Sequence, residues 1–352
     1  MRIVIQPYYF WDGHYKKYTS SLSNSNTICL ITSHIKSTKN NISLKPIFLD
    51  YRKNIFLFTL SRIFNSLNTI FYLKNYLRKN YIFHFVEFEP ISKIIFLIFN
   101  IIFRKKTLFT IHSTSISRSN NPLINFIKII QRVFFIIALI LSNFSNCKFV
   151  VHNKYNIFFL KKFILPGRIF LISYPCDTPV KKKKMNKKSR LLVFGQFRED
   201  KEMLSVFKEN KLSKIKITFA GKFFDLKLLN YLKKYKNFEI INKFISPKEL
   251  KKISLKVNFF LIPYGKNYSG SAGPMKESFS YGCPIISTEN KIFQDYITKK
   301  KMGFFLTNNI YKKIKFLSKK NYELMSEKCL NYARKNNWDN LLDKYLKIYN
   351  LF

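Results

Sequence analysis

The sequence predicts an α/β protein built from two doubly wound domains. Its 352 residues exceed what one domain core usually needs, and they suffice for two domains of roughly 150–180 residues each. Short apolar runs alternate with longer stretches of helical period along the chain, which is the pattern of βα units around parallel sheets. A hydrophobic content of 47% supports burial and argues against a disordered chain.

Six apolar runs in the first half are predicted to be buried strands. They are RIVIQ (2–6), TICLIT (27–32), IFHFVE (82–87), TLFTIH (107–112), KFVVH (148–152) and RIFLIS (168–173). Stretches 89–103, 122–142 and 154–163 between them are long enough for helices. The apolar runs 94–103 and 133–141 inside these stretches are shorter than the ~20 residues that span a bilayer. We therefore expect buried helices there, with an in-plane membrane contact as the alternative.

A polar segment then interrupts the pattern. Residues 176–189 hold two turn signals and a run of lysines without apolar period, so we interpret them as a basic linker. The linker separates a first domain, 1–175, from a second domain, 190–335. The last residues, 336–352, are predicted to form an amphipathic helix.

The second domain repeats the alternation of strands and helices. Its predicted strands are RLLVFG (190–195), KITFAG (216–221), FEIIN (238–242), VNFFLIPY (257–264), CPIIST (283–288) and GFFLT (303–307). The predicted helices are 199–209, 224–235, 247–255, 272–281 and 290–298. Ligands of such folds bind at the carboxyl ends of the strands, so we expect the site residues there.

The formal charge of +44 is extreme for a chain of this length. Lys, Asn, Ile, Phe and Tyr are enriched together, which is typical of AT-rich codons and accounts for much of the lysine. The bias does not explain the scarcity of acids in residues 1–176, where 24 Lys and Arg face four Asp and Glu, a net charge of +20. A basic, aromatic-rich half suits an anionic membrane surface or a phosphate-bearing substrate.

The cysteines and the start of the chain indicate a cytoplasmic protein. The five cysteines are scattered without a CxxC pair, which fits a reducing compartment and gives no metal motif. The start, MRIVIQPYYFWDGHY, has too short an apolar run for a signal peptide and is interpreted as a first strand.

Three of the nine glycines fall in the stretch YSGSAGPMKESFSYGCPIIST, 268–288. Small residues at the start of a helix let a ligand approach the backbone, and Pro274 suits a first-turn position because its missing N–H costs nothing there. The backbone N–H groups at the helix start would face an anion; they belong to Ser271, Ala272 and Gly273. Glu277, one turn further on, is a natural acceptor for two ribose hydroxyls. Gly282 is predicted to end the helix in the left-handed conformation.

This stretch resembles the donor-binding motif of GT-B glycosyltransferases, especially the retaining family 4 enzymes. The matching positions are Gly270, Pro274, Glu277, Gly282 and Pro284. The resemblance implies a GT-B fold, in which two Rossmann-like domains face a central cleft. It also implies that Glu277 holds the ribose. Ser269 stands where the family has its first glutamate, the contact to the donor sugar, so retention or inversion is left open.

A second segment of the resemblance is LLVFGQFREDKEM, 191–203, which is similar to the family's strand, loop and helix. It implies that Arg198 and Lys201 supply cations to the departing diphosphate, where negative charge builds up. Gln196 replaces the family's commoner arginine after the glycine. The alternative is two solvated charges at a helix start.

Two further segments of the second half are similar to the nucleotide pocket. ITFAGK, 217–222, contains Gly221 at a strand end, and the resemblance places this glycine along the nucleotide. The segment 241–264 is similar to the one whose loop receives the base, with Phe244 and Ile245 near it.

The first half resembles the family less closely. The resemblance places Gly13, in the loop after the first strand, and His112, after the strand at 107–112, near the donor sugar or phosphate. An inverting enzyme needs a general base near the acceptor hydroxyl, and Asp12, Glu87 and His112 are the unranked candidates. A retaining enzyme needs no dedicated base if the donor phosphate takes the proton.

Trp338 resembles the residue that begins the last helix of GT-B enzymes, a helix that often crosses back onto the first domain. Local packing of a terminal amphipathic helix explains the pattern equally well.

The resemblance implies a metal-independent hexosyltransferase that uses a UDP- or GDP-linked sugar, without a further cofactor. The expected acceptor is a saccharide or a lipid-linked saccharide, in cell-surface polysaccharide or glycolipid synthesis. The expected location is cytoplasmic, peripheral on the inner face of a membrane. One alternative is a catalytically inactive carbohydrate- or nucleotide-binding relative, because Ser269 and Gln196 depart from the motif. The other is a basic nucleic-acid-binding protein, although no recognised module is found.

Overall fold

The structure is a computed structural model of the chain. It describes residues 1–6, 13–23, 26–32, 41–46, 55–86, 90–112, 114, 122–180, 185, 190–209, 212, 215–265, 268, 270 and 272–352. The chain divides into two compact units, which are described one at a time. The first unit comprises Met1–Ser173 and Trp338–Phe352, and the second comprises Tyr174–Asn337.

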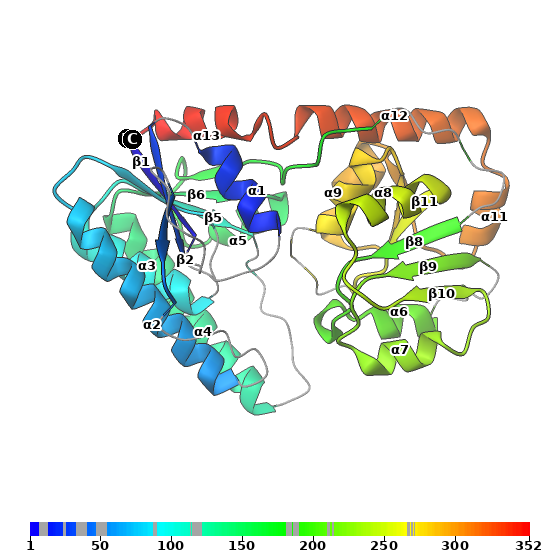
Figure 1. Ribbon diagram of the computed structural model, residues 1–352, viewed down its shortest axis with the longest axis horizontal. Helices are drawn as coiled ribbons and strands as arrows, with labels where there is room; N and C mark the ends of the chain where they lie inside the picture. Colours follow the sequence, from blue (N-terminus) through cyan, green and yellow to red (C-terminus); the bar gives the residue numbers. More distant parts are fainter. Residues whose placement is uncertain are drawn as a thin grey trace. The chain divides into compact units, whose positions relative to one another are not determined.

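The first unit is built on a seven-stranded parallel sheet with the order β3-β2-β1-β4-β5-β6-β7. Its strands are β1 (Arg2–Gln6), β2 (Thr27–Thr32), β3 (Asn41–Leu44), β4 (Ile82–Phe85), β5 (Thr107–Ile111), β6 (Cys147–Val151) and β7 (Ile169–Leu171). Its helices are α1 (Gly13–Leu22), α2 (Ile55–Leu73), α3 (Pro90–Phe103), α4 (Pro122–Leu141), α5 (Lys154–Leu160) and α13 (Leu341–Tyr349), with short 3-10 turns η1 (Lys74–Tyr76) and η2 (Ser142–Phe144). Figure 1 shows helices on both sides of this sheet.

Neighbouring side chains of one strand pack against the helices on opposite faces of this sheet. Ile3 and Ile5 of β1 pack in a cluster with residues of α2, α3, α4 and α5. Val4, between them, packs on the opposite face with α1 and α13. Successive side chains of a strand point to opposite faces, so one strand supplies both cores.

The last helix is bonded to the sheet by a buried chain of polar groups. The His84 Nδ1 lies 2.5 Å from the Tyr349 hydroxyl, and its Nε2 lies 2.8 Å from the Thr110 hydroxyl. Tyr345 continues the chain, with its hydroxyl 2.9 Å from Thr110 and 2.6 Å from the hydroxyl of Tyr18 in α1. The helix α13 is therefore an integral part of the first unit.

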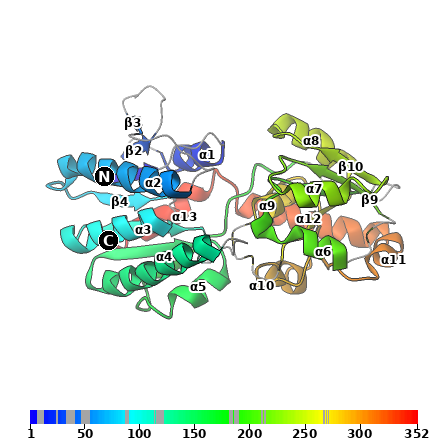
Figure 2. The same ribbon diagram turned by 90° about the horizontal axis from the view of Figure 1, so that it is seen from below.

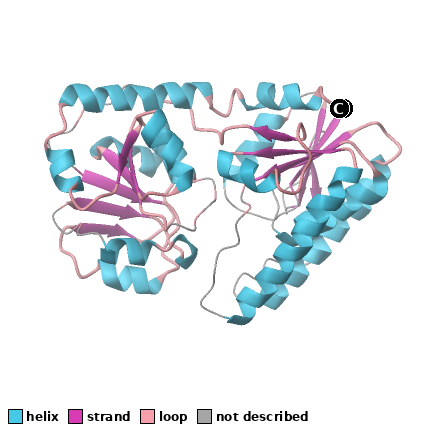
Figure 3. Ribbon diagram, turned by 180° about the vertical axis from the view of Figure 1, so that it is seen from behind, coloured by secondary structure: helices cyan, strands magenta, loops and turns pink. Residues whose placement is uncertain are grey.

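The second unit has a six-stranded parallel sheet with the order β10-β9-β8-β11-β12-β13. Its strands are β8 (Arg190–Phe194), β9 (Lys216–Ala220), β10 (Phe238–Ile241), β11 (Phe259–Ile262), β12 (Ile285–Ser287) and β13 (Gly303–Phe305). Its helices are α6 (Met203–Glu209), α7 (Leu226–Leu232), α8 (Pro247–Lys256), α9 (Gly273–Ser280), α10 (Lys291–Gln294), α11 (Ile310–Lys315) and α12 (Lys319–Lys335), with the 3-10 turn η3 (Glu199–Lys201) and the π-helical turn η4 (Asp295–Lys299). Figure 3 shows that this sheet, too, has helices on both faces.

The predicted fold class, two doubly wound α/β units with parallel sheets, is confirmed. Every predicted strand is present, most of them shorter by a residue or more at one end. The sequence did not indicate β3, α1, α2, α11 or α12. Gly13, expected in a loop, is the first residue of α1.

The expectation that 133–141 forms a buried helix is wrong. This run lies in α4, which meets the sheet along one side only, through residues such as Phe135, Ala138 and Leu139. The helical stretch Asn125–Phe144 is 20 residues long, has a mean hydropathy of 1.8 and is only 22% buried. By length and composition it is the one candidate for a membrane span among the described residues. A run of apolar residues in the sequence does not show which part of the helix surface the sheet covers.

Candidate functional site

The second unit gathers several of the predicted residues at the carboxyl ends of β8 and β9. Gly195 and Gly221 directly follow these two strands, with φ angles of 112° and 151° that favour glycine. Their backbones touch, because a Cβ built on Gly221 would lie 1.8 Å from the carbonyl oxygen of Gly195. Two adjacent strand ends without side chains leave backbone exposed to an incoming ligand.

Lys201 places a cation beside this pair of glycines. Its side chain is only 6% exposed, yet its ammonium lies 4.0 Å from the position that a Cβ of Gly195 would take. The Nζ donates a 2.7 Å hydrogen bond to the carbonyl of Gln196 and lies 4.8 Å from the ring centre of Tyr264. This hydrogen bond and the tyrosine ring hold the positive charge of Lys201 next to Gly195.

The start of α9 lies at the same place. The Cγ of Pro274 lies 3.2 Å from the position that a Cβ of Gly195 would take. Ala272, the residue before the helix, has no side-chain oxygen that could cap it, and Pro274 occupies the first turn as predicted. A Cβ built on Gly273 would meet none of the described residues within 4 Å, so the first residue of α9 faces open space in that part of the chain. The helix start and the Lys201 ammonium therefore both direct positive potential toward Gly195.

The other end of α9 is closed by its own backbone. Gly282 has a φ of 62°, which confirms the predicted left-handed ending. The amide of Gly282 donates to the carbonyl of Phe279, and the amide of Cys283 donates to that of Ser278. These two bonds form a Schellman motif. The Ser280 hydroxyl further donates to the carbonyl of Asp177, which ties this end to the segment that enters the second unit.

Glu277 lies half-buried on α9. Burial, together with the nearby carboxylates of Glu277 and Asp177, raises the pKa of Tyr281 above its usual range. The carboxylate of Glu277 is thus close enough to Tyr281 for its charge to be felt by the tyrosine hydroxyl.

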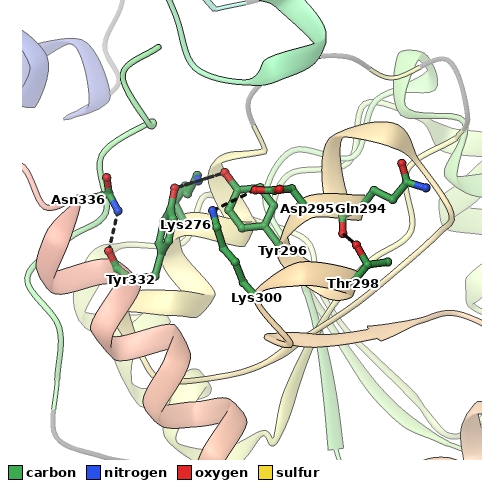
Figure 4. A network of polar contacts seen from close by, with 8 residues as sticks. All are labelled: Lys276, Gln294, Asp295, Tyr296, Thr298, Lys300, Tyr332 and Asn336. Atoms are coloured by element: carbon green, nitrogen blue, oxygen red, sulfur yellow. Dashed lines mark hydrogen bonds and ion pairs between the residues drawn. The ribbon is translucent and has the colours of Figure 1, made fainter.

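A buried lysine next to Glu277 was not anticipated. Lys276 is 3% exposed, and its Nζ donates hydrogen bonds of 2.7 Å and 2.8 Å to the hydroxyls of Tyr296 and Tyr332. Figure 4 shows this cluster, with Lys300 beside the same tyrosines and bridged to Asp295 at 3.3 Å. Burial by itself lowers the pKa of Lys276, but the adjacent Tyr296 and Tyr332 oxygens outweigh it and raise that pKa. The cluster anchors α9 to α12 and η4.

Asn290 holds the loop that leads toward α9. Its side-chain amide donates to the carbonyls of Gly265 and Tyr268, at 2.9 Å and 2.8 Å. Its side-chain oxygen accepts from the amide of Ile292 and so caps α10. An asparagine before a helix indicates a cap in the sequence, but the bonds to a loop 22 and 25 residues away do not.

For the other predicted residues of the second unit, the structure gives exposure or packing. Arg198, the residue before η3, is exposed, and Phe244 is exposed in the loop after β10. Ile245 packs partly against the core of the unit. Gly270 lies against the hydroxyl end of Tyr268.

In the first unit, His112 directly follows β5, as predicted, and is half-buried. Its Nε2 lies 3.0 Å from the carbonyl oxygen of Val86, which can only accept, so Nε2 carries the proton. Its ring meets that of Tyr18 edge-on, with the centroids 5.6 Å apart. The remaining nitrogen, Nδ1, is then the basic one, as a general base requires.

Asp12, Glu87, Ser269 and Ser271 lie outside the described residues. Within the part of the chain that the structure describes, no group of three or more His, Cys, Asp or Glu side chains could hold a metal ion. Independence from metal remains a prediction.

Comparisons with known proteins show what the fold is. No protein-family model matches the chain, and no curated protein matches it significantly. Among solved structures, the chain is similar to a sucrose-phosphate synthase from Thermosynechococcus elongatus, with 12% identity, a TM-score of 0.74, and 100% of this chain and 99% of that chain covered. It is also similar to WaaG, a glycosyltransferase of lipopolysaccharide biosynthesis, with 12% identity, a TM-score of 0.64, and coverages of 98% and 99%.

A third similar structure is Anabaena HepE in complex with UDP, with 9% identity, a TM-score of 0.66 and 100% of both chains covered. These likenesses extend over the whole chain and show a GT-B fold. The resemblance to GT-B glycosyltransferases that the sequence indicated is confirmed at the level of the fold.

Proposed function

We propose that this chain is a glycosyltransferase that moves a sugar from a nucleotide-sugar donor to a saccharide or lipid-linked saccharide. The observation that carries the proposal is the convergence of the Lys201 ammonium and the open start of α9 on the touching glycines Gly195 and Gly221. A diphosphate fits this arrangement because both features stabilise negative charge on a departing nucleotide. The similarity to HepE, described in complex with UDP, supports a nucleotide as the ligand.

The remaining roles follow from this placement. Glu277, one turn into α9, accepts hydrogen bonds from the ribose hydroxyls, and the 241–264 segment with Ile245 lies toward the base. If the reaction inverts, His112 is the described candidate for the base that takes the acceptor proton, through Nδ1. The enzyme is proposed to need no metal, because the lysine and the helix start supply the positive charge.

The proposed setting is the synthesis of cell-surface polysaccharide or glycolipid, at the cytoplasmic face of a membrane. The net charge of +20 in residues 1–176 and the apolar helices of the first unit support this setting.

Calorimetric titration with UDP and GDP tests the donor site. Glu277→Ala is expected to weaken the binding of UDP or GDP, whichever the protein binds, by about 1.5–3 kcal/mol, because a charged hydrogen-bond acceptor is lost. This corresponds to roughly a ten- to hundred-fold rise in Kd. The matched control is Glu323→Ala, which removes a half-buried glutamate from α12 of the same unit and should leave the Kd unchanged. Equal affinities of the wild type and Glu277→Ala would remove Glu277 from the site.

The second candidate is an inactive carbohydrate- or nucleotide-binding relative. It is favoured by Ser269 and Gln196, which replace an acid and an arginine of the family motif. Incubation with UDP- and GDP-sugars and detection of the released nucleoside diphosphate decides between the two: release supports the transferase, and tight binding without release over a range of acceptors supports the relative.

A further inference from the structure

The outer face of the helical layer in the first unit is apolar. Helices α2, α3 and α4 lie side by side against one face of the sheet, as Figures 1 and 2 show, with α3 packed against both neighbours. Along α4 the exposed residues recur at helical spacing and form one strip: Phe126, Ile129, Val133, Phe134, Ile137 and Ile140. The opposite side of α4 is buried against the sheet. Large apolar surfaces of this kind mark interaction sites.

A groove opens into this strip. It has a volume of about 410 Å³ and is lined by residues of all three helices, among them Ile63 of α2, Ile94 of α3 and Ile127 of α4. Phe134 lines the groove and belongs to the exposed strip, and Ile130, which also lines the groove, is exposed next to the strip residue Ile129, so the groove is continuous with the strip. Its size is within the range of small-molecule sites, and its lining is almost wholly apolar.

The charges around this face have one sign. The sequences of α2, α3 and α4 contain no Asp or Glu. Arg62 of α2 is buried, whereas α4 carries the half-exposed Lys128 and the exposed Arg132. An apolar face with basic residues among it complements an anionic lipid surface, whose headgroups meet the cations while its chains meet the apolar strip.

We propose that the outer face of α2, α3 and α4 enters the interface of an anionic lipid bilayer and that the groove takes up a lipid acyl chain. The inference rests on the proposed function for the reason to work at a membrane, and on this face for the geometry. Phe135, Ala138 and Leu139 keep α4 on the sheet, so the helix lies in the membrane plane and does not cross it.

A second copy of the chain fits this face less well than a bilayer does. In a symmetric dimer the same patch meets itself, so Lys128 and Arg132 would face cations and no acid. Like charges brought together across an interface oppose association.

Vesicle flotation tests the face. The protein should float with vesicles of phosphatidylglycerol and phosphatidylcholine and, much less, with phosphatidylcholine alone. The double variant Val133→Asp/Ile137→Asp should reduce the floated fraction at least about ten-fold. The control is Leu324→Asp in α12 of the second unit, because Leu324 is 52% exposed and Val133 is 51% exposed; this variant should float like the wild type. Equal flotation of both variants would overturn the proposal.

The groove is tested by fluorescence. Phe134→Trp should be quenched by phospholipids brominated on the acyl chain, above the signal of the native Trp11 and Trp338, whereas Leu324→Trp should not. Binding that salt removes completely, without quenching, would reduce the contact to headgroup adsorption and overturn the acyl-chain site. Dimers in sedimentation equilibrium that the double variant abolishes, together with absent flotation, would assign the face to a second copy instead.

Nucleotide titration of the same variants separates the two proposals. Val133→Asp/Ile137→Asp should bind UDP or GDP as the wild type does, because the face belongs to a different unit from Lys201 and Glu277. Nucleotide binding without flotation overturns the membrane face alone. Flotation without nucleotide binding supports the face and contradicts the donor site.

Discussion

The two units share the order of their first six strands but expose opposite kinds of helix. In the first unit, α2, α3 and α4 turn isoleucine and phenylalanine outward. In the second, α8, α11 and α12 carry lysines in most turns. A codon bias toward lysine acts on the whole chain, so it cannot by itself leave one helical layer nearly free of charge. The comparison teaches that this topology sets the core, while the outer faces are assigned separately to solvent or to a partner.

The units also differ in how they bury polar groups. The first unit buries a chain of neutral groups that runs from His84 to Tyr18. The second buries the ammonium groups of Lys201 and Lys276. A cation in the core is costly unless it is well partnered. The first unit also buries cations, the guanidinium groups of Arg2 and Arg62, but they are not part of this neutral chain.

The largest expected effect concerns the touching glycines of the second unit. Gly221→Ala should destabilise that unit by about 3 kcal/mol or more, because the new Cβ would meet backbone at 1.8 Å and cannot be accommodated by a side-chain movement. The matched change in the first unit is Gly167→Ala, where φ is 83° but no atom of the described residues lies within 4 Å of the new Cβ, so only about 1 kcal/mol is expected. Urea unfolding followed by circular dichroism measures both. Equal losses would mean that the two strand ends of the second unit are not in contact.

The next effect concerns the buried ammonium. Lys276→Ala should cost about 3 kcal/mol, because it removes the donor to two buried hydroxyls and leaves a cavity. Lys276→Met fills the same space without a charge and should cost much less, since Tyr296 and Tyr332 can bond to each other. Hydrogen exchange of α9 and α12 locates the loss. A larger loss for Lys276→Met than for Lys276→Ala would contradict this account of the cluster.

The smallest effect concerns His84, in the buried row of neutral hydrogen-bonded groups of the first unit. Burial, with help from Arg2 and His112, lowers the pKa of His84 to about 3. Above pH 6.5, the ordinary pKa, the group is neutral in the folded and the unfolded chain. Below it the unfolded chain takes up the proton first, so stability falls as the pH falls toward 3, by about 2 kcal/mol between pH 7 and pH 5.

His84→Asn should be less stable at pH 7 but should lose about 2 kcal/mol less than the wild type on going to pH 5. Trp11 and Trp338 both belong to the first unit, so tryptophan fluorescence in urea follows this unit. An identical pH dependence of the two proteins would show that His84 is not buried in its neutral form.

The strands were predictable because buried parallel strands are continuous apolar runs, as in TLFTI of β5. The helices α1 and α12 were not, because the first has only a weak apolar stripe and the second is rich in lysine and asparagine. The course of α9 was predictable from Pro274 and Gly282, since both residues act through the backbone at their own positions.

The buried contacts of the candidate site were harder to predict from the sequence. Lys276 reaches partners 20 and 56 residues away, and Tyr18 bonds to a residue 327 positions later. Local patterns give no sign of such pairs, because the sheet topology creates them. The burial of Lys201 has the same origin: Tyr264, over which its ammonium lies, follows β11, the neighbour of β8 in the sheet.

The anchoring of α13 has a consequence for synthesis of the protein. Tyr345 and Tyr349 complete a face of the first sheet, yet they follow the whole of the second unit in the chain. The amino-terminal half therefore cannot seal that face until the second unit has been made. A nascent chain stalled before residue 338 should expose the Val4 and Leu108 surface to chaperones, and a nascent chain in which α13 has left the ribosome should hide it.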